Sequence, residues 1–225
     1  MSPLPAAAHR VAVDVVTFAL REEGDGAGIP VFLALRRPRE PFRGDWALPG
    51  TLLRDGERLE EAALRILAEG PGLADPRHLE QVATFGAPGR DPRGRVVSVT
   101  YLALAPRPVE VGATAAWWPV TAAPPLAFDH AEILHSAMQR LRAKLSYSNV
   151  AYGLLPDTFT LSELQAVYEA VLDRDLDKRN FRKKVLALGL VSESHGQRRG
   201  PHRPAQLYRF TESALVVLDD VITAP

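Results

Sequence analysis

Three positions in the loop-and-helix stretch 48–73 could form a site for metal-assisted hydrolysis. Positions 66, 69 and 70 are spaced by three and four residues, so on a helix they share one face. Three carboxylates in that arrangement would bind a divalent cation and activate water against a diphosphate, because hard cations prefer several oxygen ligands. Of these three positions only one holds a carboxylate, Glu69; the other two hold Ile66 and Gly70. We therefore predict no catalytic residue and no metal site in this stretch.

Arginines flank this stretch where a phosphate-bearing ligand could bind. Arg36 and Arg37 end an apolar segment, and Arg90 and Arg93 lie in a loop dense in turn residues. A guanidinium donates paired hydrogen bonds to a phosphate, although each of these arginines could also be a solvated surface residue. Trp46 could stack on a nucleobase or pack in the core. The predicted ligand-binding residues are Arg36, Arg37, Trp46, Gly50, Glu69, Arg90 and Arg93.

Positive charge is concentrated in one segment, although the chain has 27 basic and 27 acidic residues. Residues 174–209 contain ten Lys and Arg against three Asp and Glu. Such clustering indicates contact with the phosphates of DNA, with RNA or a protein partner as alternatives. Arg179, Asn180 and Arg182 have side chains able to read base edges in a major groove. The predicted contacts to the DNA backbone are Lys178, Lys183, Lys184, Arg198, Arg199 and Arg203.

Length and composition bound the class of protein. At 225 residues the chain allows one or two domains with a sizeable core. It has no cysteine, which excludes disulfides, thiolate metal sites and cysteine nucleophiles. The N-terminus lacks the pattern of a signal peptide, and no apolar run approaches the ~20 residues that span a bilayer. We expect a cytoplasmic protein with no membrane partner.

Hydrophobic periodicity places the candidate residues on a predicted α/β domain. β-branched and partly alternating segments predict strands at 10–20, 30–36, 80–86 and 95–105, and residues 115–120 close the domain. A helix between them should end at Gly70, and a second should follow Asp129 as its N-cap. His130 and His135 are assigned structural roles because no third metal ligand lies nearby. This order predicts an α/β/α sandwich around a mixed sheet.

The second half has the order of a winged helix-turn-helix, an α+β domain. A helix over 161–172, capped by Thr160 or Ser162, precedes a second helix that starts near Asp177. A strand-like segment at 190–192, a basic loop at 196–204 and a returning strand at 205–210 complete the wing. We predict two domains, residues 1–147 and residues 148–225.

The stretch 48–73 resembles the Nudix box, G-x5-E-x7-R-E-U-x-E-E-x-G-U with U a bulky aliphatic residue. Ile66 and Gly70 stand where that family has glutamates, and Thr51 stands at the first box glycine with Gly50 beside it. The resemblance implies a Nudix-type fold that has lost hydrolysis and kept its pocket; the alternative is an amphipathic helix that matches by chance. The residues that fit the pattern are Glu57, Arg65, Leu67, Glu69, Gly72 and Leu73.

The whole chain resembles the Nudix-related transcriptional regulators of NAD metabolism, which join a degenerate Nudix domain to a winged helix-turn-helix. The resemblance is carried by residues 90–99, 159–165 and 176–184. It implies a dimeric repressor of NAD biosynthesis or salvage genes. That repressor would bind a palindromic operator in double-stranded DNA and respond to ADP-ribose or a related nucleotide, with no cofactor.

Two other functions remain open at this point. The chain could be an active Nudix diphosphate hydrolase whose basic tail holds it on nucleic acid. It could also be a sensor that binds a partner protein through its second domain. Metal-dependent turnover separates the first alternative from a regulator, and the absence of any DNA shift at low salt would indicate the second.

Overall fold

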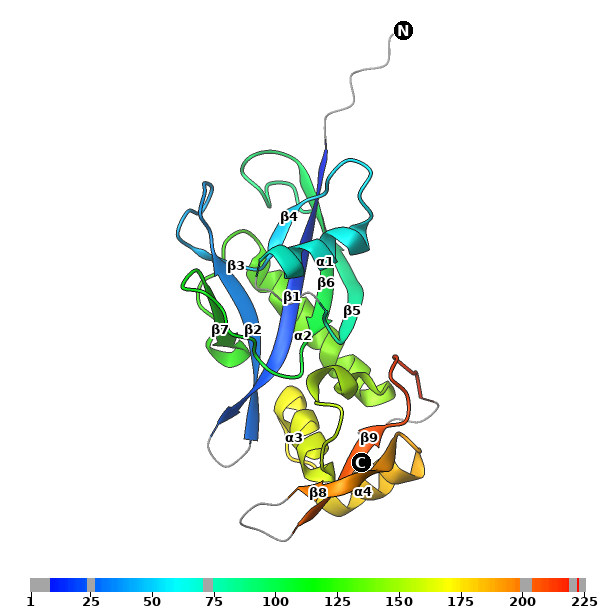
Figure 1. The fold of residues 1–225 in the computed structure, drawn as a ribbon. Helices are drawn as coiled ribbons and strands as arrows, with labels where there is room; N and C mark the ends of the chain where they lie inside the picture. The colour runs from blue at the N-terminus through cyan, green and yellow to red at the C-terminus, as the bar shows by residue number, and fades with distance from the viewer. Residues whose placement is uncertain (1–8, 24–26, 71–74, 199–203, 219–221, 223–225) are drawn as a thin grey trace.

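A mixed sheet forms the frame of the first half of the chain (Figure 1). The computed structural model describes residues 9–23, 27–70, 75–198, 204–218 and 222. In the sheet, β1 pairs in parallel with β6 and antiparallel with β2 and β4. The strands are β1 (Arg10–Glu23), β2 (Ala27–Arg36), β3 (Trp46–Ala47), β4 (Gly50–Leu52), β5 (His78–Phe85), β6 (Val96–Leu104) and β7 (Ala115–Pro119).

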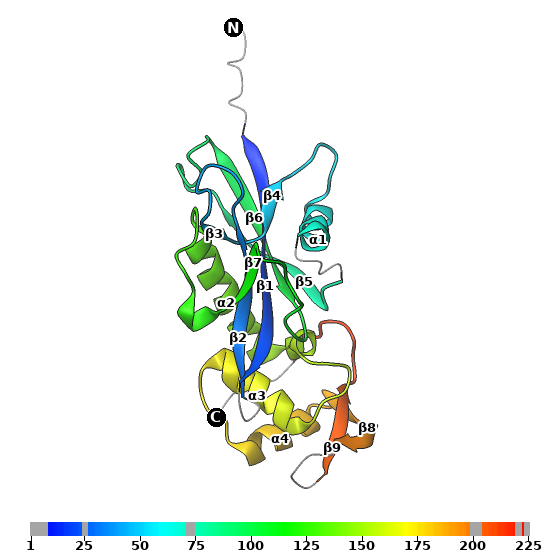
Figure 2. The same cartoon turned by 60° about the vertical axis from the view of Figure 1, so that its left-hand side comes forward.

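Strict alternation along β1 sends its side chains to two separate cores. Val13 and Val15 join a cluster under α1 (Leu59–Glu69), whereas Val16 and Phe18 join a cluster under α2 (His130–Tyr147). Figure 2 shows the two helices on opposite faces of the sheet. The predicted sandwich with a mixed sheet is confirmed.

The helix of the box stretch is anchored at its start by an ion pair. The Arg65 guanidinium donates hydrogen bonds of 2.5 and 2.8 Å to Glu57, and these bonds lower the pKa of Glu57 to about 2. The helix ends at Glu69, where the Gly70 N–H donates to the Ile66 carbonyl at 3.1 Å. Gly72 and Leu73 of the box pattern lie outside the described residues.

The second half is a winged helix, as predicted. It consists of α3 (Leu161–Leu172), α4 (Lys178–Ala187) and a hairpin of β8 (Val191–Arg198) and β9 (Ala205–Phe210). Thr160, not Ser162, caps α3: its hydroxyl accepts from the Glu163 N–H at 3.2 Å, and the Glu163 carboxylate accepts from the Thr160 N–H at 2.7 Å. The wing differs from the prediction, because residues 196–198 continue β8 by pairing with β9.

A continuous hydrophobic core joins the two halves. Leu104 and Leu141 of the first half belong to the same buried cluster as Phe159 and Tyr168 of the second. Between them, the short 3-10 helix η2 (Val150–Leu154) lies against the sheet, and a Cβ on Gly153 would lie 2.8 Å from the Leu104 Cβ. Another 3-10 turn, η1 (Val120–Ala122), follows β7. Of the described helices, none has the length and apolar character to cross a membrane.

Candidate functional site

Figure 1 shows β4 and the start of β1 at the end of the sheet remote from the winged helix. A cavity of about 330 Å³ opens there. Its walls come from β1, β4, the start of β6, the loop after β2 and the start of α2. Six charged side chains line it, which makes it a polar site within the size range of small-molecule pockets. They are Asp14, Arg37, Arg39, Arg90, Asp91 and Arg93.

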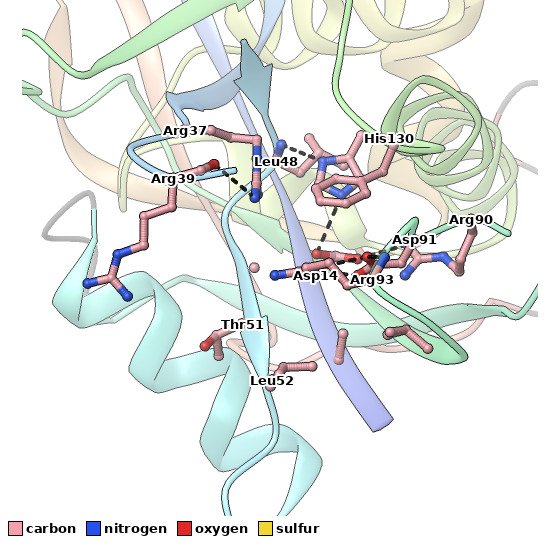
Figure 3. A pocket seen from close by; sticks show the side chains of 14 residues that line it. Asp14, Arg37, Arg39, Leu48, Thr51, Leu52, Arg90, Asp91, Arg93 and His130 are labelled. Carbon is pink, nitrogen blue, oxygen red and sulfur yellow. Dashed lines mark hydrogen bonds and ion pairs between the residues drawn. The ribbon is translucent and has the colours of Figure 1, made fainter. Parts of the chain in front are cut away.

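Asp14 is the acidic centre of this cavity and is buried (Figure 3). It stands between Val13 and Val15 but faces the opposite side of the sheet, toward α2. Its Oδ2 accepts a hydrogen bond from the Ser98 hydroxyl at 2.5 Å and lies 3.4 Å from Arg90 Nη2. A Cβ on Gly50 would lie 2.0 Å from Asp14 Oδ1, so the start of β4 approaches Asp14 as only glycine can.

His130 joins the start of α2 to the loop that forms the cavity floor. Its Nδ1 accepts a hydrogen bond of 2.9 Å from the Leu48 N–H, so the proton of the neutral ring is on Nε2. Nε2 faces Asp14 Oδ1 at 3.7 Å. Burial lowers the pKa of His130, which favours the neutral ring despite the nearby carboxylates of Asp14 and Asp129.

Arg90 is bound by acidic groups of the protein itself. Its Nε and Nη2 donate to the two carboxylate oxygens of Asp129 at 2.7 and 2.6 Å, and its side chain is only 4% exposed. Burial alone would lower the pKa of Arg90, but the bonds to Asp129 and Asp14 outweigh it and raise the pKa. Arg90 is therefore a charged residue in the cavity wall whose Nε and Nη2 groups already donate to acidic residues of the protein.

The other two predicted arginines of the cavity differ in their surroundings. Arg93 donates to Asp91 at 2.9 and 2.7 Å, a hydrogen-bonded pair that raises the pKa of Arg93 and lowers that of Asp91. Arg37 lies with its guanidinium carbon 4.6 Å from the centre of the Phe128 ring. Burial and the nearby charge of Arg93 lower the pKa of Arg37. An incoming anion would relieve that repulsion.

Phe128 forms an aromatic wall in a constrained conformation. Its φ is +56° and that of Phe42 is +64°, in the left-handed region that side chains rarely adopt. The two rings meet edge to face at 4.8 Å between centroids. Such strain is typical of functional sites, where packing holds a residue in a disfavoured conformation.

The structure brings together four of the seven predicted ligand-binding residues, namely Arg37, Gly50, Arg90 and Arg93. The other three do not line the cavity. The Arg36 guanidinium lies 4.2 Å from the Trp46 ring centre, and Trp46 packs edge to face on Trp118. Glu69 is 60% exposed and pairs with Arg54 and Arg65 at 3.5 and 3.7 Å.

Further cavity residues were not recognised from the sequence as ligand-site candidates, among them Asp14, Arg39, Asp91, Phe128 and His130. Asp14 had a usable signal, since it is the one charge in an otherwise apolar strand segment, VAVDVVTFAL. His130 was assigned a structural role because it had no metal-ligand spacing. Its hydrogen bond to Leu48 spans 82 residues and has no local sequence pattern.

The hydrolytic arrangement considered for positions 66, 69 and 70 does not form. Ile66 is buried in the core under α1, Glu69 points to solvent, and Gly70 lies beyond the helix end. Among the residues that the structure describes, no group of three or more His, Cys, Asp and Glu could hold a metal ion.

The basic residues of the second half gather on the outer surface of α4. Lys178, Arg179, Asn180 and Lys183 are exposed, while Phe181 and Val185 are buried beneath them. Arg182 is held toward α3 by a 2.9 Å bond to the Ser162 hydroxyl, and Arg198, the last residue of β8, pairs with Glu163. Lys184 is half-buried, and Arg199 and Arg203 lie outside the described residues.

Comparison with known proteins gives the same two-part organisation. Residues 8–137 match the NUDIX domain, and residues 151–210 match the NrtR DNA-binding winged helix domain. The chain belongs to the NrtR family. A curated relative is the ADPR responsive transcriptional repressor NtrR of Acinetobacter baylyi. It is 38% identical over 187 residues, which are 79% of this chain and 74% of the relative.

Solved NrtR structures match almost the entire chain. The structure of Shewanella oneidensis NrtR complexed with a 27mer DNA has a TM-score of 0.81 and 33% identity, with 94% of this chain and 98% of that chain covered. The Nudix domain of the same protein, complexed with ADP ribose, matches with a TM-score of 0.51 and 33% identity over 60% of this chain and 90% of that one. These NrtR comparisons confirm the family expected from the sequence.

Proposed function

We propose that this protein is a transcriptional repressor of NAD biosynthesis or salvage genes that responds to ADP-ribose or a related nucleotide. The observation that carries the proposal is the joining, in one chain, of an arginine-lined Nudix cavity and a winged helix with an exposed basic α4. The relative from Acinetobacter baylyi is named as an ADPR responsive repressor, and the Shewanella oneidensis relative was crystallised with DNA and with ADP ribose.

Residues 1–147 form the effector-sensing part in this proposal and residues 148–225 the DNA-binding part. Arg37 and Arg93 contact the diphosphate, and Gly50 lets β4 lie close to Asp14 in the cavity. Exposure supports Lys178, Arg179, Asn180 and Lys183 as the first contacts of α4 with the major groove and its phosphates. Arg182, Lys184 and Arg198 join them at the edges, and Arg199 and Arg203 extend the wing.

The proposed repressor acts in the cytoplasm as a homodimer on a palindromic operator. Two recognition helices must match two half-sites, so their separation determines operator affinity. Effector binding changes the relative population of dimer geometries and hence that separation. Coupling of this kind is typically about 1–3 kcal/mol, enough to change operator occupancy several-fold.

We further propose that the cavity binds its nucleotide without efficient hydrolysis. One observation favours testing the alternative: 48% of this chain is 34% identical to the ADP-ribose pyrophosphatase of Methanocaldococcus jannaschii. With Ile66 buried and Glu69 outside the cavity, metal-dependent turnover of ADP-ribose should stay far below ordinary enzyme rates. Turnover at ordinary rates would favour the hydrolase. A large gain in the double variant Ile66→Glu, Gly70→Glu would show that the missing carboxylates limit the reaction.

The experiment that tests the regulator is fluorescence anisotropy with a labelled promoter of the neighbouring NAD genes, with and without ADP-ribose at fixed salt. We expect tight binding that ADP-ribose changes several-fold. Binding that is indifferent to ADP-ribose would remove that effector. The absence of a shift at low salt would remove the DNA-binding function.

A further inference from the structure

Two of the four cavity arginines are already bound to acidic residues of the protein. Arg93 is paired with Asp91, and Arg90 with Asp129 and Asp14. A diphosphate entering the cavity would compete with these carboxylates for the guanidinium groups. The cavity therefore contains carboxylates that compete with the ligand for its arginines. Replacement of a carboxylate by the ligand's phosphate would couple ligand binding to a change in the protein.

Asp129 is the competitor whose displacement would have a structural consequence. Asp14 is buried in the sheet and fixed by Ser98 at 2.5 Å, and Asp91 lies in the same loop as its partner Arg93. Asp129, by contrast, occupies the N-cap position of α2. Its carboxylate makes no capping hydrogen bond there and instead accepts from Arg90 with both oxygens.

We propose that the effector's diphosphate takes Arg90 from Asp129, and that the released Asp129 carboxylate then caps α2 and so transmits occupancy of the cavity to this helix. This inference rests on the proposed function. The exchange breaks the bidentate Arg90–Asp129 pair and forms an Arg90–phosphate pair of the same charge. The freed carboxylate lies beside the first-turn N–H groups of α2, where a negative charge is favourable.

Helix α2 is the element able to carry such a change to the winged helix. It has 18 residues and is therefore about 27 Å long. Near its other end the Arg142 Nε donates to the Val171 carbonyl of α3 at 2.9 Å, and Lys144 pairs with Glu80. After the helix, the Ser148 hydroxyl donates to the Lys144 carbonyl at 2.6 Å and the chain enters η2.

The sign of one affinity change tests the proposal. If Asp129 competes with the effector, Asp129→Asn should bind ADP-ribose more tightly, by about three- to tenfold, because a charged pair no longer has to be broken. If Asp129 only orients Arg90 for the ligand, the same variant should bind more weakly. Calorimetric titration of the full-length protein without DNA measures this.

Glu132→Gln is the matched control. Glu132 is an exposed acid in the first turn of the same helix and its removal changes the net charge equally. Its ADP-ribose affinity should stay close to that of the wild type. An equal gain in both variants would overturn the proposal, because it would reflect the general loss of negative charge near the cavity.

The second measurement is the effect of ADP-ribose on operator affinity. In Asp129→Asn this effect should shrink at least about threefold although the effector binds more tightly. Asp129→Ser, which can cap a helix but cannot pair with Arg90, should also bind ADP-ribose more tightly and serves if the Asn variant fails to fold. An undiminished operator response in a variant that binds more tightly would overturn the transmission step.

The two proposals fail in different ways. A wild-type protein that does not bind ADP-ribose overturns the proposed function and this inference with it. A wild-type protein that binds ADP-ribose and changes its operator affinity in response, combined with an Asp129→Asn variant of unchanged or lower ADP-ribose affinity, overturns the inference alone.

Discussion

At the scale of single residues, the cavity depends on contacts closer than sequence patterns can specify. Gly50 was predicted to contact the ligand, and the structure gives it a second role as the neighbour of Asp14. A side chain at position 50 would collide with Asp14 Oδ1 at 2.0 Å, and Asp14 is held in place by Ser98. The start of β4, Asp14 and Ser98 therefore form one packed unit in the cavity.

Gly50→Ala should therefore impair the cavity as well as the fold. Moving either the start of β4 or Asp14 to admit a methyl group should lower the free energy of unfolding by about 1–3 kcal/mol. Thermal unfolding measures this, and titration should show weaker ADP-ribose binding. Gly112→Ala is the control, because a Cβ at position 112 meets nothing within 4 Å. Equal stability of the two variants would contradict the packing argument.

His130 should make stability depend on pH through its buried neutral ring. Its folded pKa lies below the ordinary value of 6.5 because burial disfavours the charged form. The unfolded chain therefore takes up a proton that the folded chain does not, so this contribution is present above about pH 6.5 and lost as the pH falls below it. His130→Asn keeps an acceptor for the Leu48 N–H but cannot titrate.

Denaturant unfolding of the two proteins between about pH 7 and 5 measures this contribution. The loss of stability on acidification should be shallower in His130→Asn. Parallel profiles of stability against pH in the two proteins would show that His130 does not control the loss of stability on acidification. The carboxylates whose pKa values are lowered, such as Asp91, are common to both proteins and titrate at lower pH.

Residue types in the cavity could be predicted from sequence, but their partners could not. Arg90 and Arg93 were identified as arginines in a turn-rich loop next to a pocket. Asp129 was expected to cap a helix, and it stands at the N-cap while its carboxylate binds Arg90, 39 residues earlier. The capping pattern is local, whereas that ion pair forms because the loop before β6 and the start of α2 meet at the cavity.

At the scale of elements, periodicity located the helices and most of the long strands, and it failed where strand pairing decides the structure. The three-residue β4 and the two-residue β3 are too short to show a period, and they exist because β1 and β2 offer them backbone partners. The extension of β8 through Arg198 has the same origin. A basic, glycine-containing segment is typical of a loop until a partner strand satisfies its backbone.

Mutations in α4 should distinguish contacts to the bases from contacts to the phosphates of DNA. Arg179→Ala should remove about 1–3 kcal/mol of binding free energy at one operator position and relax specificity there. Lys183→Ala should weaken binding to all sequences alike and reduce the slope of log K against log salt by about 0.9. Anisotropy titrations across a salt series, with operator and scrambled DNA, distinguish the two. Unchanged operator affinity in Arg179→Ala would remove α4 as the recognition helix.

At the scale of the whole molecule, the shared core predicts that the two halves unfold together. All three tryptophans, at positions 46, 117 and 118, belong to the first half. Tryptophan fluorescence therefore reports the first half alone, whereas far-UV circular dichroism reports both. The two thermal transitions should coincide, and two separate midpoints would contradict a shared core.

A variant in the second half sharpens this prediction. Val171 of α3 is fully buried in the shared core, and Val171→Ala should remove about 1–3 kcal/mol of stability. If the halves are coupled, the thermal midpoint measured by the fluorescence of the first-half tryptophans should fall as well. Leu186→Ala is the control, since Leu186 is 46% exposed on α4 and its truncation should leave that midpoint unchanged.

The close approach of η2 to the sheet bears on how proteins of this design can diversify. A DNA-binding domain that is exchanged freely between sensor domains in evolution has a complete hydrophobic core of its own. Here Gly153 meets Leu104 with no space for a methyl group, and the interior of the winged helix continues into that of the sensor. New regulators should therefore arise by drift in the cavity wall and on the outer surface of α4, with the joint between the halves inherited as a single block.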